Sequence, residues 1–529
     1  MAEVGGILEH FCGSRHLALL NQRLAADSGF TSAGMPEPPL AQDSWAQGPK
    51  TCLFMRVVFP DDPTQPISED GAYALLDGVN QWYVENSYGT TSITPTVTPL
   101  LLLPQTKGWY GVQGTGALLA DARAAALAAG YDSDLFNWDM VRHTTVPGPG
   151  FAWSGLAQVH GKGLWLQSSA LNVACHELGH NYGLWHANSW SALGDSVIGP
   201  GANLEYGNTF DTMSTIGAGN NQFNAAFKNQ LDWLPFSFVS TITQSGTYRL
   251  HAYDVPGLAA GQTYALRVRK NYGRNYWVEF RQKFTANPWL QNGVLLNWDP
   301  WNNGVANSAG GTQLLDTTPG TQAANNGKDD AAVTLGRTFS DFAAGVHITP
   351  VAVSHAGDDN WIDVVVQLSA APNTPPAALL TADRTFAGVN IAVHFSVSAN
   401  DPDNDPLAYS WDFADDTVGP NSATATKAWA NAGEYVVRRT VSDMKGGLFT
   451  QSLLVTVGSP VAYHLSGTIT TSDGFPLAGV RLHNGLTGAA YRSTFSDSDG
   501  HYVLANLPAG SLSPTAVKYG YHFTHAGWT

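Results

Sequence analysis

The segment Cys175–His186, CHELGHNYGLWH, contains histidines and a glutamate with the types and the spacing of a catalytic metal site. His176 and His180 are four residues apart, so on a helix both imidazoles lie on one face and can bind the same ion. Glu177 is rotated by about 100° from His176. It therefore stands beside the ion, where it can accept a proton from a metal-bound water. These residues predict a hydrolytic metal centre.

His186 completes the predicted ligand set, and Gly183 explains how its side chain reaches the ion. A helix that continued to His186 would place that imidazole out of phase with the first two. Gly183 can adopt a positive φ and turn the chain back towards the metal. Three imidazoles and one water form an open tetrahedral zinc site, whereas a structural zinc usually has four protein ligands and no adjacent general base. We therefore predict one catalytic Zn²⁺.

The elements before these residues must position the helix that carries them. A buried strand is expected from Thr51 to Pro60, a helix over Glu69–Tyr88, where apolar residues recur at helical spacing, and an Ala-rich helix over 116–129. The segment Gly155–Gln167 has the glycines and the alternation of an exposed strand. This order of elements predicts an α+β catalytic domain over residues 48–236.

The complete pattern H-E-x-x-H-x-x-G-x-x-H resembles that of the metzincin metallopeptidases, in which a methionine-containing turn follows the zinc ligands. Here YGNTFDTMST contains Met213, 27 residues after His186. An isolated methionine is ordinarily core packing, but after this motif the resemblance implies that Met213 forms the turn beneath the metal. Some metzincins carry a metal-approaching tyrosine two residues after this methionine. That position is Thr215 here, so no tyrosine-assisted step is predicted.

Residues 50–235 resemble the gametolysin family and, more distantly, the secreted immune-inhibitor-A type of bacterial peptidases. The resemblance implies hydrolysis of peptide bonds and a substrate-binding edge strand just before the zinc helix. Leu164, Trp165 and Leu166 occupy that position, and an extended peptide can add to such an edge through main-chain hydrogen bonds. The alternative is an ordinary sheet strand that has no role in substrate binding.

Beyond residue 236 the sequence consists of alternating strand and turn signals, which predict all-β domains. Residues 237–370 resemble the β domain that follows the catalytic domain in immune-inhibitor-A-like peptidases. Residues 373–458, with ANDPDNDPLAYSWDFADD and WANAGEYVVRRTVSD, resemble a PKD domain, an Ig-like sandwich. Residues 462–523, with SDSDGHYVLANLPAG, resemble the carboxypeptidase regulatory-like β-sandwich. The predicted fold is therefore multidomain, an α+β metzincin-like catalytic domain followed by all-β domains.

The PKD-like segment contains three aspartates at alternate positions, Asp401, Asp403 and Asp405. Carboxylates spaced in this way can bind Ca²⁺. Asp-Pro sequences also form simple turns without any ion. Both interpretations stay open at this stage.

Residues 1–47 are interpreted as an N-terminal segment that holds the remnant of a pro-segment. Related enzymes can carry an inhibitory thiolate on the open zinc position, and Cys12, in HFCG, is one candidate for that role. The other interpretations are a free thiol or a bridge between Cys12 and Cys52. The chain has three cysteines, which cannot form a disulfide framework.

Charge and composition exclude some classes of partner. The formal net charge is -16, with 42 Asp and Glu against 26 Lys and Arg and no basic cluster, so nucleic acid is not an expected partner. No apolar stretch is long enough to span a membrane. The first twenty residues lack the features of a secretory signal, yet the β-rich appendages are typical of extracellular or cell-surface proteins. The chain ends at HAGWT, so a longer native protein is possible.

These observations predict a secreted zinc endopeptidase that hydrolyses extracellular proteins or glycoproteins, with Glu177 as general base. The C-terminal β modules would act as spacers or contact glycan or matrix. The alternative is a cell-surface adhesion protein whose peptidase-like domain has little activity.

Overall fold

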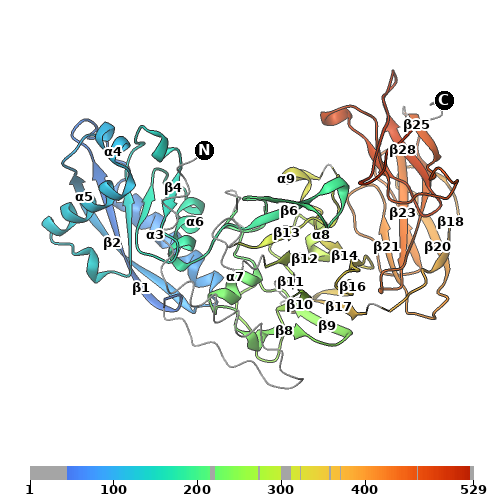
Figure 1. Cartoon of the computed structure of the whole chain (residues 1–529), viewed down its shortest axis with the longest axis horizontal. Helices are drawn as coiled ribbons and strands as arrows, with labels where there is room; N and C mark the ends of the chain where they lie inside the picture. The colour runs from blue at the N-terminus through green and yellow to red at the C-terminus, as the bar shows by residue number, and fades with distance from the viewer. Residues whose placement is uncertain are drawn as a thin grey trace.

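The computed structural model describes residues 45–214, 221–271, 274–299, 311–321, 323–356, 359–369, 371–460 and 463–524. Cys12 and Thr215 lie outside these ranges. Three parts follow one another along the long axis of the molecule: an α+β part, a central β part and a pair of β modules at the far end (Figure 1). The predicted fold class is thereby confirmed.

The α+β part is built on a five-stranded sheet in the order β2-β1-β3-β5-β4. The central strand β1 (Gly48–Val58) pairs in parallel with β2 (Thr91–Leu102) and with β3 (Trp138–Arg142). β5 (Leu164–Leu166) is parallel to β3, and β4 (Gly155–Ala157) runs antiparallel to β5 at the edge of the sheet. The segment expected to form one exposed strand is therefore two strands joined by a turn.

The prediction that Leu164, Trp165 and Leu166 form an open edge strand is wrong. These residues are buried and lie between β3 and β4. Leu164 and Leu166 contribute to the apolar core on one face of the sheet, and Trp165 to the core on the other face. All three side chains are apolar, so both faces of this strand are stabilised by burial against a core. This is the physical reason for its interior position. The edge belongs to β4.

Helices cover both faces of this sheet. α3 (Glu69–Asn86) begins at Ser68, whose hydroxyl accepts a hydrogen bond from the Gly71 amide at 3.0 Å. It shares one core with α6 (Leu171–Tyr182), where Tyr83 stacks on Tyr182 with ring centroids 5.0 Å apart. α4 (Lys107–Gln113) and α5 (Thr115–Ala128) contribute to the core on the other face. The helix that carries the predicted zinc motif is thus fixed on the main core.

The central part contains an eight-stranded sheet, in which the order is β7-β6-β13-β12-β11-β10-β8 and β14 also pairs with β12. Its strands are β6 (Asn188–Ala192), β7 (Gly201–Leu204), β8 (Val239–Ile242), β10 (Ala265–Asn271), β11 (Arg274–Glu279), β12 (Gly293–Trp298), β13 (Gln313–Leu315) and β14 (Val333–Thr334). β6 and β7 come from the segment predicted as catalytic domain. The predicted boundary between residues 236 and 237 therefore does not separate two independent sheets.

A second sheet packs on the first and closes the core of the central part. Its order is β15-β16-β17-β9, formed by β9 (Gly246–His251), β15 (Phe339–Asp341), β16 (Val346–Ala356) and β17 (Asp359–Leu368). Tyr276 and Trp298 are among the large buried side chains between the layers. Short helices α7 (Ala225–Gln230), α8 (Pro288–Gln291) and α9 (Ala324–Gly327) join the strands.

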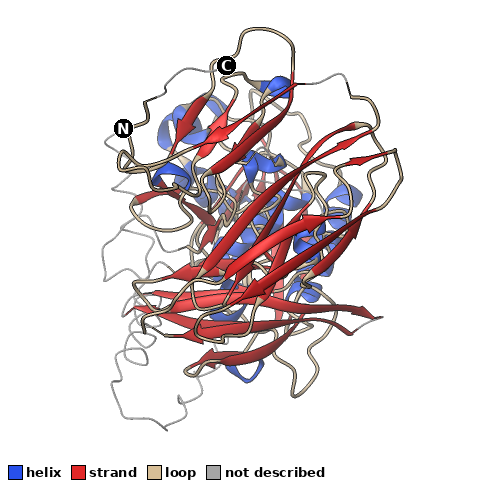
Figure 2. Ribbon diagram, turned by 90° about the vertical axis from the view of Figure 1, so that its right-hand side faces the viewer, coloured by secondary structure: helices blue, strands red, loops and turns tan. Residues whose placement is uncertain are grey.

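The last two modules are built mainly of strands, which Figure 2 shows in red. The PKD-like module has a sheet of β18 (Ala377–Ala382), β20 (Val393–Asn400) and β22 (Thr424–Lys427), and a sheet of β19 (Phe386–Ala387), β24 (Leu448–Val457), β23 (Gly433–Ser442) and β21 (Ala408–Asp412). The C-terminal module pairs β25 (Tyr463–Thr468) with β28 (His501–Leu507), and β26 (Arg481–His483) with β27 (Ser493–Phe495) and β29 (Thr515–Val517). Among the described helices, none is long and apolar enough to cross a membrane.

Candidate metal centre

The end of α6 redirects the chain at the predicted site. Gly183 has a φ of 110° and a left-handed conformation, and its amide donates to the His180 carbonyl at 2.8 Å. The Leu184 amide donates to the Gly179 carbonyl at 3.0 Å, which completes a helix-ending turn. Because the helix ends at Gly183, the chain turns back towards the face of α6 that carries His176 and His180, and His186 lies next to them.

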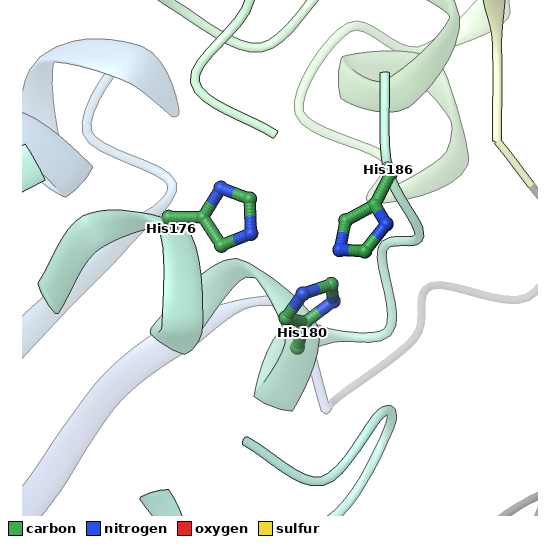
Figure 3. Close-up of side chains that lie close together, drawn as sticks. All are labelled: His176, His180 and His186. Atoms are coloured by element: carbon green, nitrogen blue, oxygen red, sulfur yellow. The ribbon is translucent and has the colours of Figure 1, made fainter. Parts of the chain in front are cut away.

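The three predicted histidines lie together. Each of His176, His180 and His186 offers a ligand atom, and these atoms are all within 4.8 Å of one another. Their ring centroids are 4.9 Å apart for 176 and 180, 4.9 Å for 180 and 186, and 5.5 Å for 176 and 186. Figure 3 shows the rings converging on one point from the helix and from the loop after it.

Each of the three imidazoles is oriented by a hydrogen bond at Nδ1. The partners are the Thr212 carbonyl for His176 and the Leu184 carbonyl for His180, each at 2.8 Å, and Glu205 Oε1 for His186 at 2.7 Å. A ring that donates from Nδ1 keeps a lone pair on Nε2, which is the usual arrangement of metal-binding histidines and their supporting partners. The donor set therefore fits a zinc ion bound through three Nε2 atoms.

Burial favours the neutral form of these rings. Burial lowers the pKa of His176 to about 4, and burial followed by the neighbouring histidines holds the pKa of His180 well below its usual value. The pKa of His186 is also lowered, mainly by burial, with Glu205 acting in the opposite direction. Since neutral imidazole is the form that binds metal, the site is prepared for an ion near neutral pH.

Glu177 lies on α6 next to the first histidine and is only 8% exposed. Burial raises the pKa of its carboxyl to about 8, whereas a nearby cation favours the ionised form. A Cβ on Gly155 would lie 2.7 Å from Glu177 Oε1. The absence of a side chain at Gly155 thus lets the edge strand β4 pass directly beside this carboxylate.

Met213 is fully buried beneath α6. A Cβ on Gly179 would lie 2.4 Å from Met213 Sδ, so the glycine allows the methionine to pack against the helix between the two histidine turns. The Met213 amide donates to Asp211 Oδ1 at 2.7 Å, and its carbonyl accepts from the Ala187 amide at 2.8 Å. The turn therefore supports both α6 and the residue that follows His186.

Glu205 and Tyr206 are residues of this site that the sequence analysis did not identify. Glu205 holds the His186 ring, and the Tyr206 ring centroid lies 4.0 Å from that of His186. Tyr206 has a φ of 58°, and its carbonyl accepts a hydrogen bond from the Ser214 hydroxyl. Both residues follow β7 directly, and no spacing relative to the zinc motif marks them in the sequence.

The three aspartates of the PKD-like module also lie together, within 4.8 Å of one another through their ligand atoms. Asp401 is 5% exposed, and its Oδ1 accepts from the amides of Asp403 at 2.9 Å and Asp405 at 3.0 Å. The Oδ2 atoms of Asp401 and Asp405 are buried and have no hydrogen-bond partner. Lys445 pairs with the other oxygen of Asp405. These two buried carboxylate oxygens can therefore bind a hydrogen-bond donor or a cation.

Comparisons with known proteins agree with this arrangement. Residues 73–285 match the family model described as gametolysin peptidase M11, and residues 373–457 match that of the PKD domain. The resemblance to gametolysin-type peptidases and to PKD domains is thereby confirmed. The peptidase match continues to residue 285, past the predicted boundary at 236 and into the central β part. The carboxypeptidase regulatory-like assignment of residues 462–523 stays a prediction.

Individual relatives match over short ranges. Collagenase ColA of Clostridium perfringens is 35% identical over 86 residues, which are 16% of this chain and 8% of the collagenase. Solved PKD domains from an M14-like peptidase of a Thermoplasmatales archaeon and from Vibrio anguillarum Epp are 20% and 24% identical. Each covers 17% of this chain and 100% of the solved domain, with TM-scores of 0.16 and 0.15.

Proposed function

We propose that this protein is a secreted zinc-dependent endopeptidase. The observation that carries the proposal is the convergence of two buried imidazoles of α6 and the half-buried imidazole of His186, each oriented through Nδ1, beside the buried Glu177 carboxylate of α6. His176, His180 and His186 are the proposed zinc ligands. Three protein ligands would leave one position of a tetrahedral zinc ion open, as in catalytic rather than structural zinc sites.

Zinc bound here would polarise the scissile carbonyl and lower the pKa of a bound water towards 7. Glu177 is the proposed general base, because its carboxylate follows His176 directly on α6 and is shielded from solvent. After taking the proton, the same residue can return it to the leaving amine. Met213 and Gly183 have supporting roles: the first packs beneath the ligand helix and the second brings His186 into position.

The edge strand β4 is the proposed binding site for the substrate backbone. The edge of β4 with which no described strand pairs can bind an extended peptide, and Gly155 lies against Glu177. This proposal replaces Leu164–Leu166, which are paired on both sides. The substrates that fit are extended segments of extracellular proteins or glycoproteins, and the C-terminal β modules are proposed to bring the enzyme to glycan or matrix.

Hydrolysis of casein or gelatin tests the proposed function. We expect hydrolysis by the mature protein to stop after dialysis against a chelator and to recover when Zn²⁺ is added back. The reason is that the proposed reaction depends on the zinc ion bound by the three histidines. Addition of Mg²⁺ is the matched control and is expected not to restore activity, since Mg²⁺ prefers oxygen ligands. No hydrolysis under any metal condition would favour the alternative, a cell-surface adhesion protein with a peptidase-like domain.

A second metal is proposed at Asp401, Asp403 and Asp405, where Ca²⁺ would satisfy the buried Oδ2 atoms. With an affinity typical of extracellular modules and Ca²⁺ at about 100 times the dissociation constant, binding stabilises the folded module by about 2.7 kcal/mol. We expect Ca²⁺ to raise the unfolding temperature of this module. The measurement is calorimetric unfolding with and without Ca²⁺.

Asp405→Asn is expected to abolish the calcium effect, because it removes a ligand charge without removing bulk. Asp473→Asn, at an exposed position of the C-terminal module, is the matched control and should retain the effect. An unfolding temperature of the unmodified chain that does not depend on Ca²⁺ would mean that the three aspartates form a turn only.

A further inference from the structure

The hairpin of β6 and β7 connects the metal centre to a distant module of the chain. Its first strand begins two residues after His186, and its second strand ends immediately before Glu205 and Tyr206. The base of the hairpin therefore carries one proposed ligand, the carboxylate that orients it and the aromatic ring packed against it. Its tip extends away from the site towards the C-terminal modules (Figure 1).

The tip is held by the C-terminal module. Asp195 Oδ2 accepts a hydrogen bond from Arg481 Nε at 2.5 Å across 286 positions in the sequence, and the two side chains are only 18% and 17% exposed. Arg481 is fixed from the other side by the Tyr491 hydroxyl at 2.8 Å. A Cβ on Gly194 would lie 2.3 Å from Tyr519 Cβ, so this glycine allows the turn after β29 to close on the tip.

The tip has a conformation that benefits from such a contact. Gly194 and Asp195 have φ values of 64° and 59°. A non-glycine residue in the left-handed region costs free energy unless its surroundings hold it. The charged pair with Arg481 supplies that support at Asp195. A Cβ on Gly320 would lie 2.9 Å from both Arg481 Nε and Asp195 Oδ1, so the pair is enclosed from a third direction.

The strand that returns from the tip depends on this support more than its partner does. β6 is paired on both sides, with β13 and with β7, whereas β7 is the last strand of the sheet and pairs only with β6 among the described strands. Gln313 adds one side-chain hydrogen bond to Asn203 at 2.5 Å. Movement of β7 would displace Glu205 and Tyr206, because these residues form the turn that begins at Leu204, the last residue of β7.

We propose that the C-terminal module is a positioning element of the metal centre. Through Arg481 and Tyr519 it fixes the tip of the β6–β7 hairpin, and the edge strand β7 transmits this constraint to Glu205 and thence to His186. The proposal rests on the proposed zinc site and extends it. It assigns to the C-terminal module a role in the active site beyond that of a spacer.

The test compares zinc binding by the full-length chain and by Arg481→Ala. Zinc affinity is measured on metal-free protein by competition with a chromophoric chelator, so the readout does not require activity. Loss of an orienting partner of a ligand typically weakens metal binding by about 10–100-fold, and Glu205→Gln is expected to fall in this range. A change transmitted to Glu205 from the hairpin tip is smaller, so Arg481→Ala is expected to weaken zinc about threefold to tenfold.

Three comparisons make this result specific. Asp473→Asn is the control, since Asp473 lies at an exposed position of the same module. Its zinc affinity should equal that of the unmodified chain. The charge exchange Asp195→Arg with Arg481→Asp should recover part of the lost affinity. In a Glu205→Gln background, Arg481→Ala should not weaken zinc binding further, because the hairpin acts on His186 through the Glu205 carboxylate.

Zinc affinity of Arg481→Ala within twofold of the unmodified chain would overturn the proposal, and so would equal losses in the presence and absence of Glu205. Asp195→Asn provides a second variant if Arg481→Ala does not fold, because it weakens the same pair from the side of the hairpin tip. These outcomes are distinct from failure of the proposed function, which would appear as absence of hydrolysis, or of zinc binding, in the unmodified chain.

Discussion

Glu177→Gln is expected to lower kcat/KM for a peptide substrate by about 10³-fold while zinc remains bound. General base catalysis by a positioned side chain contributes about 10²–10⁴-fold, and glutamine cannot accept the proton from water. The substitution preserves the size of a side chain that is packed beside β4. Because Glu177 is not among the three proposed ligands, zinc content should stay at one ion per chain. The measurements are steady-state kinetics and metal analysis of the same preparation.

The matched control for this variant is Glu69→Gln, which changes a carboxylate at the start of α3, 59% exposed and outside the metal centre. Its kinetics should resemble those of the unmodified chain. Retention of full activity by Glu177→Gln would refute the assignment of the base. Loss of both zinc and activity would instead indicate that Glu177 holds the ion or the helix in place.

The ligand set was predictable because its geometry is local. Two histidines four residues apart on one helix, and a glycine that ends the helix before a third, define the site within eleven residues. α6 ends at Gly183 with the expected positive φ, and the three rings meet. The N-cap of this helix is Ala170, which has no side chain able to accept a hydrogen bond.

Features that depend on pairing between distant segments were not predictable. An apolar run such as Leu164–Leu166 reads alike at an edge and inside a sheet, and its position was set by β4, only three residues long. Glu205 reaches His186 only because the β6–β7 hairpin folds back on itself. β6 leaves the catalytic part and pairs in parallel with β13, more than one hundred residues away. No signal in the sequence predicts this pairing.

The shared sheet is reinforced by polar groups buried between the α+β part and the central part. Arg281 donates to the Phe210 carbonyl at 2.5 Å, and the Ala225 amide donates to Glu279 Oε2 at 2.8 Å. Asn224 Nδ2 donates to Thr312 Oγ1 at 2.7 Å. Each hydrogen bond joins a residue close in sequence to Met213 with a residue in β11 or next to β11 or β13. A buried polar group that loses its partner costs about 1–3 kcal/mol, and more where it is charged.

A chain that ends at Pro235 is therefore expected neither to fold cooperatively nor to retain zinc, although it contains every proposed ligand. It would lose β13, which pairs with β6 directly after the third histidine, and Thr312, whose carbonyl accepts from the Asn188 amide at 2.8 Å. It would also expose the apolar face that packs on Tyr253 and Trp277. Circular dichroism, thermal unfolding and zinc content measure the outcome.

A chain that ends at Ala371 is the matched control, because it keeps both sheets of the central part and removes only the last two modules. It should fold and bind one zinc, with the affinity weakened to the extent expected for loss of the Arg481 contact. A folded, zinc-binding fragment ending at Pro235 would show that residues 48–236 form an independent domain. We expect instead that this fragment neither folds nor binds zinc, because the metal centre depends on both parts of the molecule. The ligand helix α6 packs on the five-stranded sheet, whereas Glu205, which orients the third ligand, follows a strand of the eight-stranded sheet.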